Sequence, residues 1–197
     1  MSSWEKPQGI PIGIEVFNCI EKKQVPLILR KEHKFATWYT CGPTVYDSSH
    51  IGHASCYMKL DIIQRILTDY FKVDLVTAMN ITDIDDKIIK KGQESGTTWT
   101  EKLNIRKPDI KIRVTEHIPK IINFIEKLVQ DGFAYVGSDK SVYFKVSSYP
   151  NYGKLQKVVL DDKNVEHKSS SADFALWKAK KQPDEPFWNS PWGEGRP

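Results

Sequence analysis

The alternation of hydrophobic and polar positions predicts short strands in the first part of the chain and a long helix after them. Apolar runs at 14–20 and 25–30 are typical of two strands joined by a turn at 21–23. A β-branched and aromatic run at 36–41 predicts a third strand, which ends at a Gly-Pro turn. Between about residues 52 and 70, apolar residues recur in steps of 4, 3, 4 and 3. This spacing predicts a helix whose apolar face carries Cys56, Leu60, Ile63, Leu67 and Tyr70.

The run 73–79 predicts another strand directly after this helix. A strand, a helix and a strand in this order are typical of two parallel strands joined by a right-handed crossover. We therefore expect an α/β fold in which residues 36–90 contain one strand–helix–strand unit.

The second half of the chain has a different pattern. Apolar positions from Ile118 to Val129 predict an amphipathic helix that ends at Gly132. The runs 134–136 and 142–146 are typical of a hairpin, and the polar stretch 161–171 is typical of a loop. An aromatic stretch that we expect to pack against other residues then follows, with Phe174, Trp177, Phe187, Trp188 and Trp192.

Composition narrows the class of protein. The 197 residues are 40% hydrophobic and 27% charged, which excludes wholesale disorder. No apolar run approaches about 18 residues, so we expect no transmembrane helix and no membrane partner. The net charge of +4 permits a phosphate or nucleic-acid ligand without requiring one. Cys19, Cys41 and Cys56 form no Cys-x-x-Cys pair, which favours a reducing compartment over a disulfide scaffold. The N-terminus resembles neither a secretory signal nor a mitochondrial presequence.

Residues 43–53 lie between a predicted strand and the start of the long helix. The N–H groups and partial positive charge of a helix N-terminus favour anions, and Gly52 permits close backbone approach. His50 and His53 share one face of the first turn and could donate hydrogen bonds to a triphosphate. Two other interpretations stay open: the histidines only cap and pack the helix, or they bind a metal together with Cys41.

Residues 80–90 begin at the carboxyl end of the next predicted strand. In open parallel sheets, ligands bind at these carboxyl ends. A purely structural interpretation is also available, because Thr82 or Asp83 could cap a helix whose acidic first turn complements its dipole. The three aspartates of this segment could instead bind a divalent metal.

Together these segments resemble the cysteinyl-tRNA synthetase family. The resemblance rests on residues 39–47, on the segment 80–90 and on His-Ile-Gly-His at 50–53, the signature of class I aminoacyl-tRNA synthetases. It continues in family order and covers nearly the whole chain from about Ile14. The later matching segments are 113–119, 142–144, 152–155, 172–178 and 190–197. Two segments, 38–47 and 171–179, look most like the mitochondrial branch.

The resemblance implies an α/β fold and a division into domains. We expect the N-terminal half of a Rossmann-like, parallel-sheet nucleotide-binding domain of a class I synthetase, with an inserted α+β connective subdomain. Residues 1–114 would form the first half of the catalytic domain and residues 115–185 the connective subdomain. Residues 186–197 would begin the return to the catalytic domain.

The resemblance also implies a reaction: ATP-dependent activation of L-cysteine to cysteinyl-adenylate, then transfer to tRNA(Cys) for mitochondrial translation. The expected compartment is the mitochondrial matrix, with the cytoplasm as the alternative. His50 and His53 match the family's catalytic histidines. Gly42 and Thr82 match positions that contact the substrate cysteine, and Cys41 matches a ligand of a Zn²⁺ ion. The residues expected to contact ATP, which is used with Mg²⁺, are His50, Ile51, Gly52, His53, Lys87 and Lys90.

The chain departs from the family pattern in several places. The family continues beyond Pro197 with Gly-Trp-His-Ile-Glu-Cys-Ser, a KMSKS loop and anticodon-binding helices. It also carries an acidic helical stretch where Thr100 and Glu101 adjoin here, and many members have an arginine in place of Ser55. These departures predict an N-terminal fragment or splice form that is inactive alone. A non-catalytic nucleotide-binding module is one alternative, and an unrelated Rossmann-like nucleotide-binding protein is another.

Overall fold

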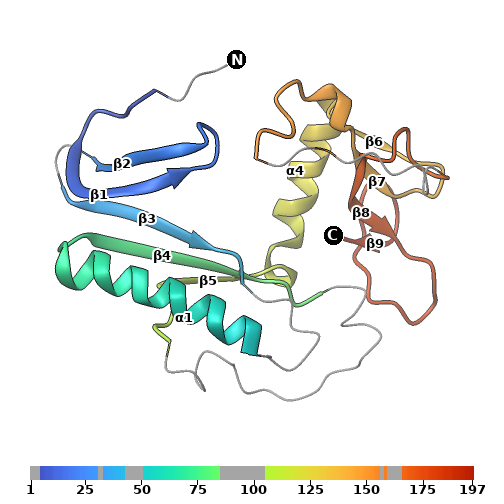
Figure 1. Cartoon of the computed structure of the whole chain (residues 1–197). Coiled ribbons are helices and arrows are strands. Elements are labelled where there is room, and N and C mark those ends of the chain that lie inside the picture. The colour runs from blue at the N-terminus through green and yellow to red at the C-terminus, as the bar shows by residue number, and fades with distance from the viewer. Residues whose placement is uncertain (1–4, 31–32, 43–50, 85–104, 156–157, 159–165) are drawn as a thin grey trace. The chain divides into compact units, whose positions relative to one another are not determined.

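The computed structural model describes residues 5–30, 33–42, 51–84, 105–155, 158 and 166–197. The chain divides into two compact units, Met1–Val114 and Thr115–Pro197 (Figure 1). Each unit has its own hydrophobic cluster and is described by itself. The mixed α/β architecture agrees with the fold class expected from the sequence.

The centre of the first unit is a parallel sheet with the strand order β3–β4–β5 (Figure 1). β3 spans Phe35–Thr40 and β4 spans Asp74–Ile81, and the two strands are parallel. Between them along the chain lies α1, Ile51–Arg65, which continues as the π-helix η1, Ile66–Tyr70. The prediction of a strand–helix–strand unit is therefore confirmed.

The third strand of this sheet, β5 (Ile110–Arg113), was not predicted from the sequence. It pairs in parallel with the carboxyl half of β4. Its position is fixed by Asp109, whose Oδ2 accepts hydrogen bonds from the backbone N–H of Thr77 at 2.7 Å and from its hydroxyl at 2.8 Å. Because the strand has four residues and all of them are exposed, it carries too short a pattern to be recognised.

The buried face of α1 differs from the predicted one. The structure buries Tyr57, Asp61 and Leu67, whereas three residues of the predicted face, Cys56, Ile63 and Tyr70, are exposed. The prediction of that face is confirmed at Leu67 and wrong at these three positions, because α1 carries apolar residues on more than one side. Exposed positions also include Met58, Ile62 and Ile66. Periodicity alone therefore could not decide which stripe meets the sheet.

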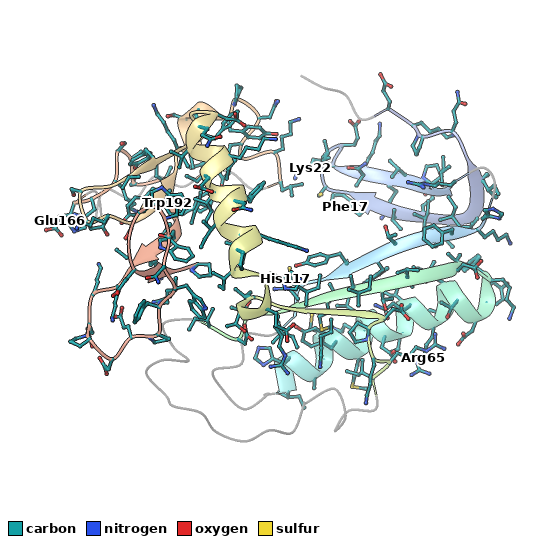
Figure 2. The ribbon with its side chains drawn as sticks, turned by 180° about the vertical axis from the view of Figure 1, so that it is seen from behind. Phe17, Lys22, Arg65, His117, Glu166 and Trp192 are labelled. Atoms are coloured by element: carbon teal, nitrogen blue, oxygen red, sulfur yellow. The ribbon has the colours of Figure 1, made fainter. Side chains whose placement is uncertain are left out.

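The contacts of Asp61 explain why the face of α1 that carries Tyr57 and Asp61 is the buried one. The residue is only 9% exposed, and its carboxylate is fully engaged. Oδ2 accepts from Nε of Arg65 at 2.7 Å, and Oδ1 accepts from the backbone N–H of Arg106 at 3.2 Å. A buried carboxylate is tolerated when it is paired and hydrogen-bonded in this way. Figure 2 labels Arg65 on α1.

The predicted N-terminal hairpin is confirmed, with strands β1 (Ile10–Asn18) and β2 (Lys23–Leu29) in antiparallel pairing. Its turn is closed by Asn18, whose Oδ1 accepts from the backbone N–H groups of Ile20 and Glu21 at 2.9 and 3.2 Å. Phe17 and Lys22 lie near this turn (Figure 2). The other end of the hairpin packs on the first unit's cluster of Leu29, Leu67 and Val73.

The second unit begins with the 3-10 turn η2, Thr115–His117, and helix α4, Ile118–Gln130. The predicted end of this helix is confirmed. Gly132 has a φ of +78°, its N–H donates to the carbonyl of Val129, and the N–H of Phe133 donates to the carbonyl of Leu128. This pair of bonds is a Schellman cap, which needs a left-handed residue after the helix.

A four-stranded antiparallel sheet packs beside α4, in the order β6–β7–β8–β9 (Figure 1). Strands β6 (Ala134–Val136) and β7 (Val142–Phe144) confirm the predicted hairpin, and the 3-10 turn η3, Val146–Ser148, follows. β8 (Phe174–Ala179) was not predicted as a strand. The aromatic stretch does pack as expected, because Trp177 is 0% exposed within a core that includes α4 and Trp192 (Figure 2).

The C-terminal residues complete this sheet. β9, Gly195–Arg196, pairs with β8, and Trp188 forms an antiparallel bridge with Gly195. That residues 186–197 also begin the return to a catalytic domain stays a prediction. Among the helices that the structure describes, none combines the length and the apolar character needed to cross a bilayer.

Candidate functional site

The candidate site lies at the carboxyl ends of β3 and β4. The register of these parallel strands pairs Thr40 with Met79, so the next residues, Cys41 and Asn80, lie abreast. Three of the residues expected to contact the substrate or a metal, Cys41, Gly42 and Thr82, lie at or just beyond the strand ends. The parallel pairing therefore brings the two separate sequence segments together.

Asn80 links the two strand ends through one side-chain oxygen. Its Oδ1 accepts a hydrogen bond from the backbone N–H of Gly42 at 2.9 Å and another from the hydroxyl of Tyr39 at 2.9 Å. The backbones also approach closely, because a Cβ atom at position 42 would overlap the carbonyl oxygen of Asn80. Only glycine fits here without moving β4.

Cys41 is held by its backbone while its side chain is exposed. Its carbonyl oxygen accepts a hydrogen bond at 3.0 Å from the hydroxyl of Tyr57, which lies on α1. Its Sγ lies 4.0 Å from the hydroxyl oxygen of Tyr39. The thiol is therefore presented at the end of the strand, next to a phenol.

Both tyrosine hydroxyls stay protonated at neutral pH. Burial, then the hydrogen bond and the charge of Cys41, raise the pKa of Tyr39. Burial, then the charges of Cys56 and Cys41, raise the pKa of Tyr57. A phenol with a raised pKa keeps its proton and can donate, which is the role that both hydroxyls have here.

Of the two candidate catalytic histidines, His53 lies within the described residues. It lies in the first turn of α1, half-buried, and one turn before Tyr57 on the same face of the helix. Since Tyr57 reaches the carbonyl of Cys41, this face of α1 is directed toward the end of β3. Ile51 and Gly52, also candidate ATP contacts, are exposed at the start of the helix.

Several candidates cannot be placed. His50, Lys87 and Lys90 lie outside the described residues, as do Asp85 and Asp86 of the alternative metal interpretation. Thr82 is described and half-buried, directly after β4 and two residues beyond Asn80. Its expected contact with a substrate stays a prediction.

The described residues were also tested for a metal site. In that part of the chain, no group of three or more His, Cys, Asp and Glu side chains is arranged to hold an ion. A zinc ion needs about four ligands, three of them from the protein in a catalytic site. The described residues offer the exposed thiol of Cys41 at the strand ends but no ligand set. They do not fit a zinc ion by themselves.

Sequence reasoning missed Tyr39, Tyr57 and Asn80 as members of this site. Tyr39 and Asn80 lie inside the segments already selected, and aligning the carboxyl ends of the two predicted strands would have placed Asn80 beside Cys41. Tyr57 had no such signal, because the predicted apolar face of α1 did not include it.

Comparisons with known proteins show which family the chain resembles over most of its length. Residues 28–197 match the family described as tRNA synthetases class I (C) catalytic domain. The chain is 44% identical over 212 aligned positions to a probable mitochondrial cysteine–tRNA ligase of Xenopus tropicalis, covering 98% of this chain and 37% of that protein. It is 40% identical to a cytoplasmic cysteine–tRNA ligase of Dictyostelium discoideum, covering 98% of this chain and 34% of that protein.

An archaeal protein is similar to the same degree. The chain is 44% identical to the cysteine–tRNA ligase of Thermococcus kodakarensis, covering 94% of this chain and 43% of that protein. This chain therefore spans roughly two fifths or less of the length of these relatives. The alignment to the Xenopus protein has 212 positions, whereas this chain has 197 residues, so that relative carries residues in this region that are missing here. That these residues fall after Thr100 stays a prediction.

Proposed function

Since the chain belongs to the class I tRNA synthetase (C) catalytic domain family, we propose that it supplies the N-terminal part of a cysteine–tRNA ligase. In the first reaction a carboxylate oxygen of L-cysteine attacks the α-phosphorus of ATP, and the bond to pyrophosphate breaks. In the second, a ribose hydroxyl at the end of tRNA(Cys) attacks the carbonyl carbon and AMP leaves. The proposal is supported by the contact between Gly42 and Asn80 at the carboxyl edge of the sheet. The face of α1 that carries His53 and Tyr57 is directed toward the same edge.

ATP is proposed to bind at the start of α1. His50 and His53 would donate hydrogen bonds to its phosphates, and the helix N-terminus at Ile51 and Gly52 would favour their negative charge. Donors aimed at charge that develops on the phosphates lower the barrier more than they tighten ATP binding. Lys87, Lys90 and Mg²⁺ are proposed to add positive charge on the same side of the nucleotide.

L-cysteine is proposed to bind at the strand ends, with Gly42 and Thr82 in contact with it. Cys41 is proposed as one zinc ligand, because thiolates are the ligands that zinc favours and the Cys41 thiol is exposed. The other ligands are proposed to come from protein that continues beyond the residues of this chain.

We propose two further points, one about the catalytic activity of the isolated chain and one about its cellular compartment. The 197-residue chain alone is expected not to form cysteinyl-adenylate. A nucleotide-binding module without catalysis is the second candidate function. Relatives of both compartments match nearly the whole chain, and the mitochondrial matrix is preferred on the mitochondrial-like segments 38–47 and 171–179.

A chimeric enzyme tests the proposal. Residues 1–197 would replace the matching region of the Thermococcus kodakarensis ligase, and cysteine-dependent exchange of pyrophosphate into ATP would be measured. We expect exchange that requires cysteine and is not supported by serine. The matched control is the same chimera with His53→Ala. A folded chimera with no exchange, beside an active parent enzyme, would contradict the proposed function.

A further inference from the structure

We propose that Asn80 is a positioning residue that sets the place of the Cys41 thiol at the end of β3. Neither the reaction chemistry nor the family signature requires this role. It follows from contacts that Asn80 makes with the neighbouring strand end. The inference depends on the proposed function only where it treats the Cys41 thiol as a metal ligand.

The first step is the double use of one oxygen atom. Oδ1 of Asn80 accepts from the N–H of Gly42 and from the hydroxyl of Tyr39, both at 2.9 Å. These donors lie on either side of Cys41 in the sequence. A single amide oxygen therefore holds the backbone N–H of the residue after the cysteine and the phenol of Tyr39, two residues before it. The first bond restrains the backbone next to Cys41, and the second keeps the phenol beside its thiol.

The second step is the close approach of the two backbones. Because a Cβ at position 42 would overlap the carbonyl oxygen of Asn80, the strand end cannot move closer to β4. The hydrogen bond from Gly42 prevents it from moving away. The hydroxyl of Tyr57 adds a third restraint from α1, at 3.0 Å from the carbonyl oxygen of Cys41. The thiol is thus presented from a backbone that is held from β4 and from the helix.

The test uses the 197-residue chain and needs no zinc, ATP or tRNA. Backbone amide hydrogen exchange is followed by NMR at Gly42, and alkylation of the three cysteines by iodoacetamide is followed by mass spectrometry. Asn80→Ala removes the acceptor, and we expect Gly42 exchange to rise about five- to tenfold relative to the other amides of β3 and β4. Alkylation of Cys41 should rise with it, because Tyr39 is released from its place beside the thiol. Asn80→Asp keeps an acceptor oxygen and should restore both values.

Asn18→Ala is the matched control. Asn18 is also half-buried, and its Oδ1 also accepts two hydrogen bonds, but these close the β1–β2 turn next to Cys19. This variant should leave Gly42 and Cys41 unchanged. If Asn80→Ala prevents folding, Tyr39→Phe removes one of the two donors and should still speed Cys41 alkylation.

Three outcomes would overturn the proposal. The first is Gly42 exchange and Cys41 alkylation that stay at wild-type rates in a folded Asn80→Ala chain. The second is a rise shared by all amides, which would make Asn80 a purely structural residue. The third is no recovery in a folded Asn80→Asp chain. Since no nucleotide or metal enters the measurement, a failure here leaves the chimera experiment untouched, and an inactive chimera leaves this result untouched.

Discussion

The hydroxyl of Tyr57 on α1 donates a 3.0 Å hydrogen bond to the carbonyl oxygen of Cys41 at the end of β3. The crossover helix is thereby fixed to the strand that precedes it, at the point where the candidate substrate residues begin. The first turn of the helix, which carries His53, takes its position relative to Cys41 from this contact.

Removing this hydroxyl should weaken the fold by a measurable amount. For Tyr57→Phe we expect a loss of about 0.5–1.5 kcal/mol in the free energy of unfolding, because the ring stays buried and one hydrogen bond is lost. Urea unfolding followed by fluorescence measures it. Tyr70→Phe is the matched control on η1, where the ring is largely exposed, and it should change little. Equal effects of the two variants would contradict the importance of the Tyr57 bond.

A methyl group at position 42 should force β3 and β4 apart. Because the added Cβ of Gly42→Ala would overlap backbone of Asn80, we expect a destabilisation of about 2 kcal/mol or more. Gly13→Ala is the control: Gly13 has a φ of +84° but open space around it, so its cost is about 1 kcal/mol of conformational strain. Urea unfolding measures the loss in free energy of unfolding for both variants. A loss for Gly42→Ala that is no larger than the loss for Gly13→Ala would contradict the close approach of the two backbones.

Acid should weaken the attachment of β5. Hydrogen bonds from the backbone and hydroxyl of Thr77 lower the pKa of Asp109 below its ordinary value of 3.8. A carboxyl with a lowered folded pKa stabilises the fold above the unfolded pKa, and this contribution is lost as the pH falls below about 3.8 through the folded pKa. Unfolding midpoints between pH 6 and pH 2.5 should therefore decline less steeply in Asp109→Asn.

Thr77→Val completes a double-mutant cycle for the same contact. We expect the effects of Asp109→Asn and Thr77→Val to be non-additive, since either change removes the same hydrogen bonds. Additive effects at pH 6 would show that the two residues are energetically independent.

In the chimeric ligase, His53→Ala should lower cysteine-dependent pyrophosphate exchange by roughly 10²–10³, the loss typical of one transition-state donor. The effect should fall on kcat more than on the KM for ATP. Met58→Ala, an exposed position on the same helix, is the control and should retain full exchange. A His53→Ala chimera with an unchanged rate would reduce this histidine to a packing residue.

The isolated chain should be prone to self-association. Met58, Ile62, Ile63 and Ile66 leave an apolar stretch exposed on α1 and η1, and such a surface favours aggregation. Ile62→Lys should raise the fraction of monomer in light scattering without lowering the unfolding midpoint. We also expect no stoichiometric zinc and no exchange activity in the isolated chain. Bound zinc together with measurable exchange would contradict the expectation that it is inactive alone.

The strand–helix–strand unit, both hairpins and the glycine end of α4 could be predicted because local patterns encode them. The buried face of α1 could not be predicted. It contains Asp61, and a carboxylate can be buried there only because Arg65 and the backbone N–H of Arg106 donate hydrogen bonds to it. β8 was hidden because its residues alternate poorly, and the burial of Trp177 depends on α4, far away in the sequence. In the site, Cys41, Gly42 and Thr82 follow from motifs, whereas the role of Asn80 depends on strand register.

The contacts of Arg106 affect which changes in chain length the fold can accept. Its N–H bonds Asp61, and its guanidinium bonds the Thr68 hydroxyl at 2.8 Å and the Asp69 carboxylate at 2.9 Å. Arg106 thus anchors the chain to α1 and η1 shortly before β5 begins. Doubling the length of a loop costs only about 0.6 kcal/mol of closure entropy. A relative whose chain is longer before Arg106 can therefore keep the same sheet edge, as long as these contacts are retained.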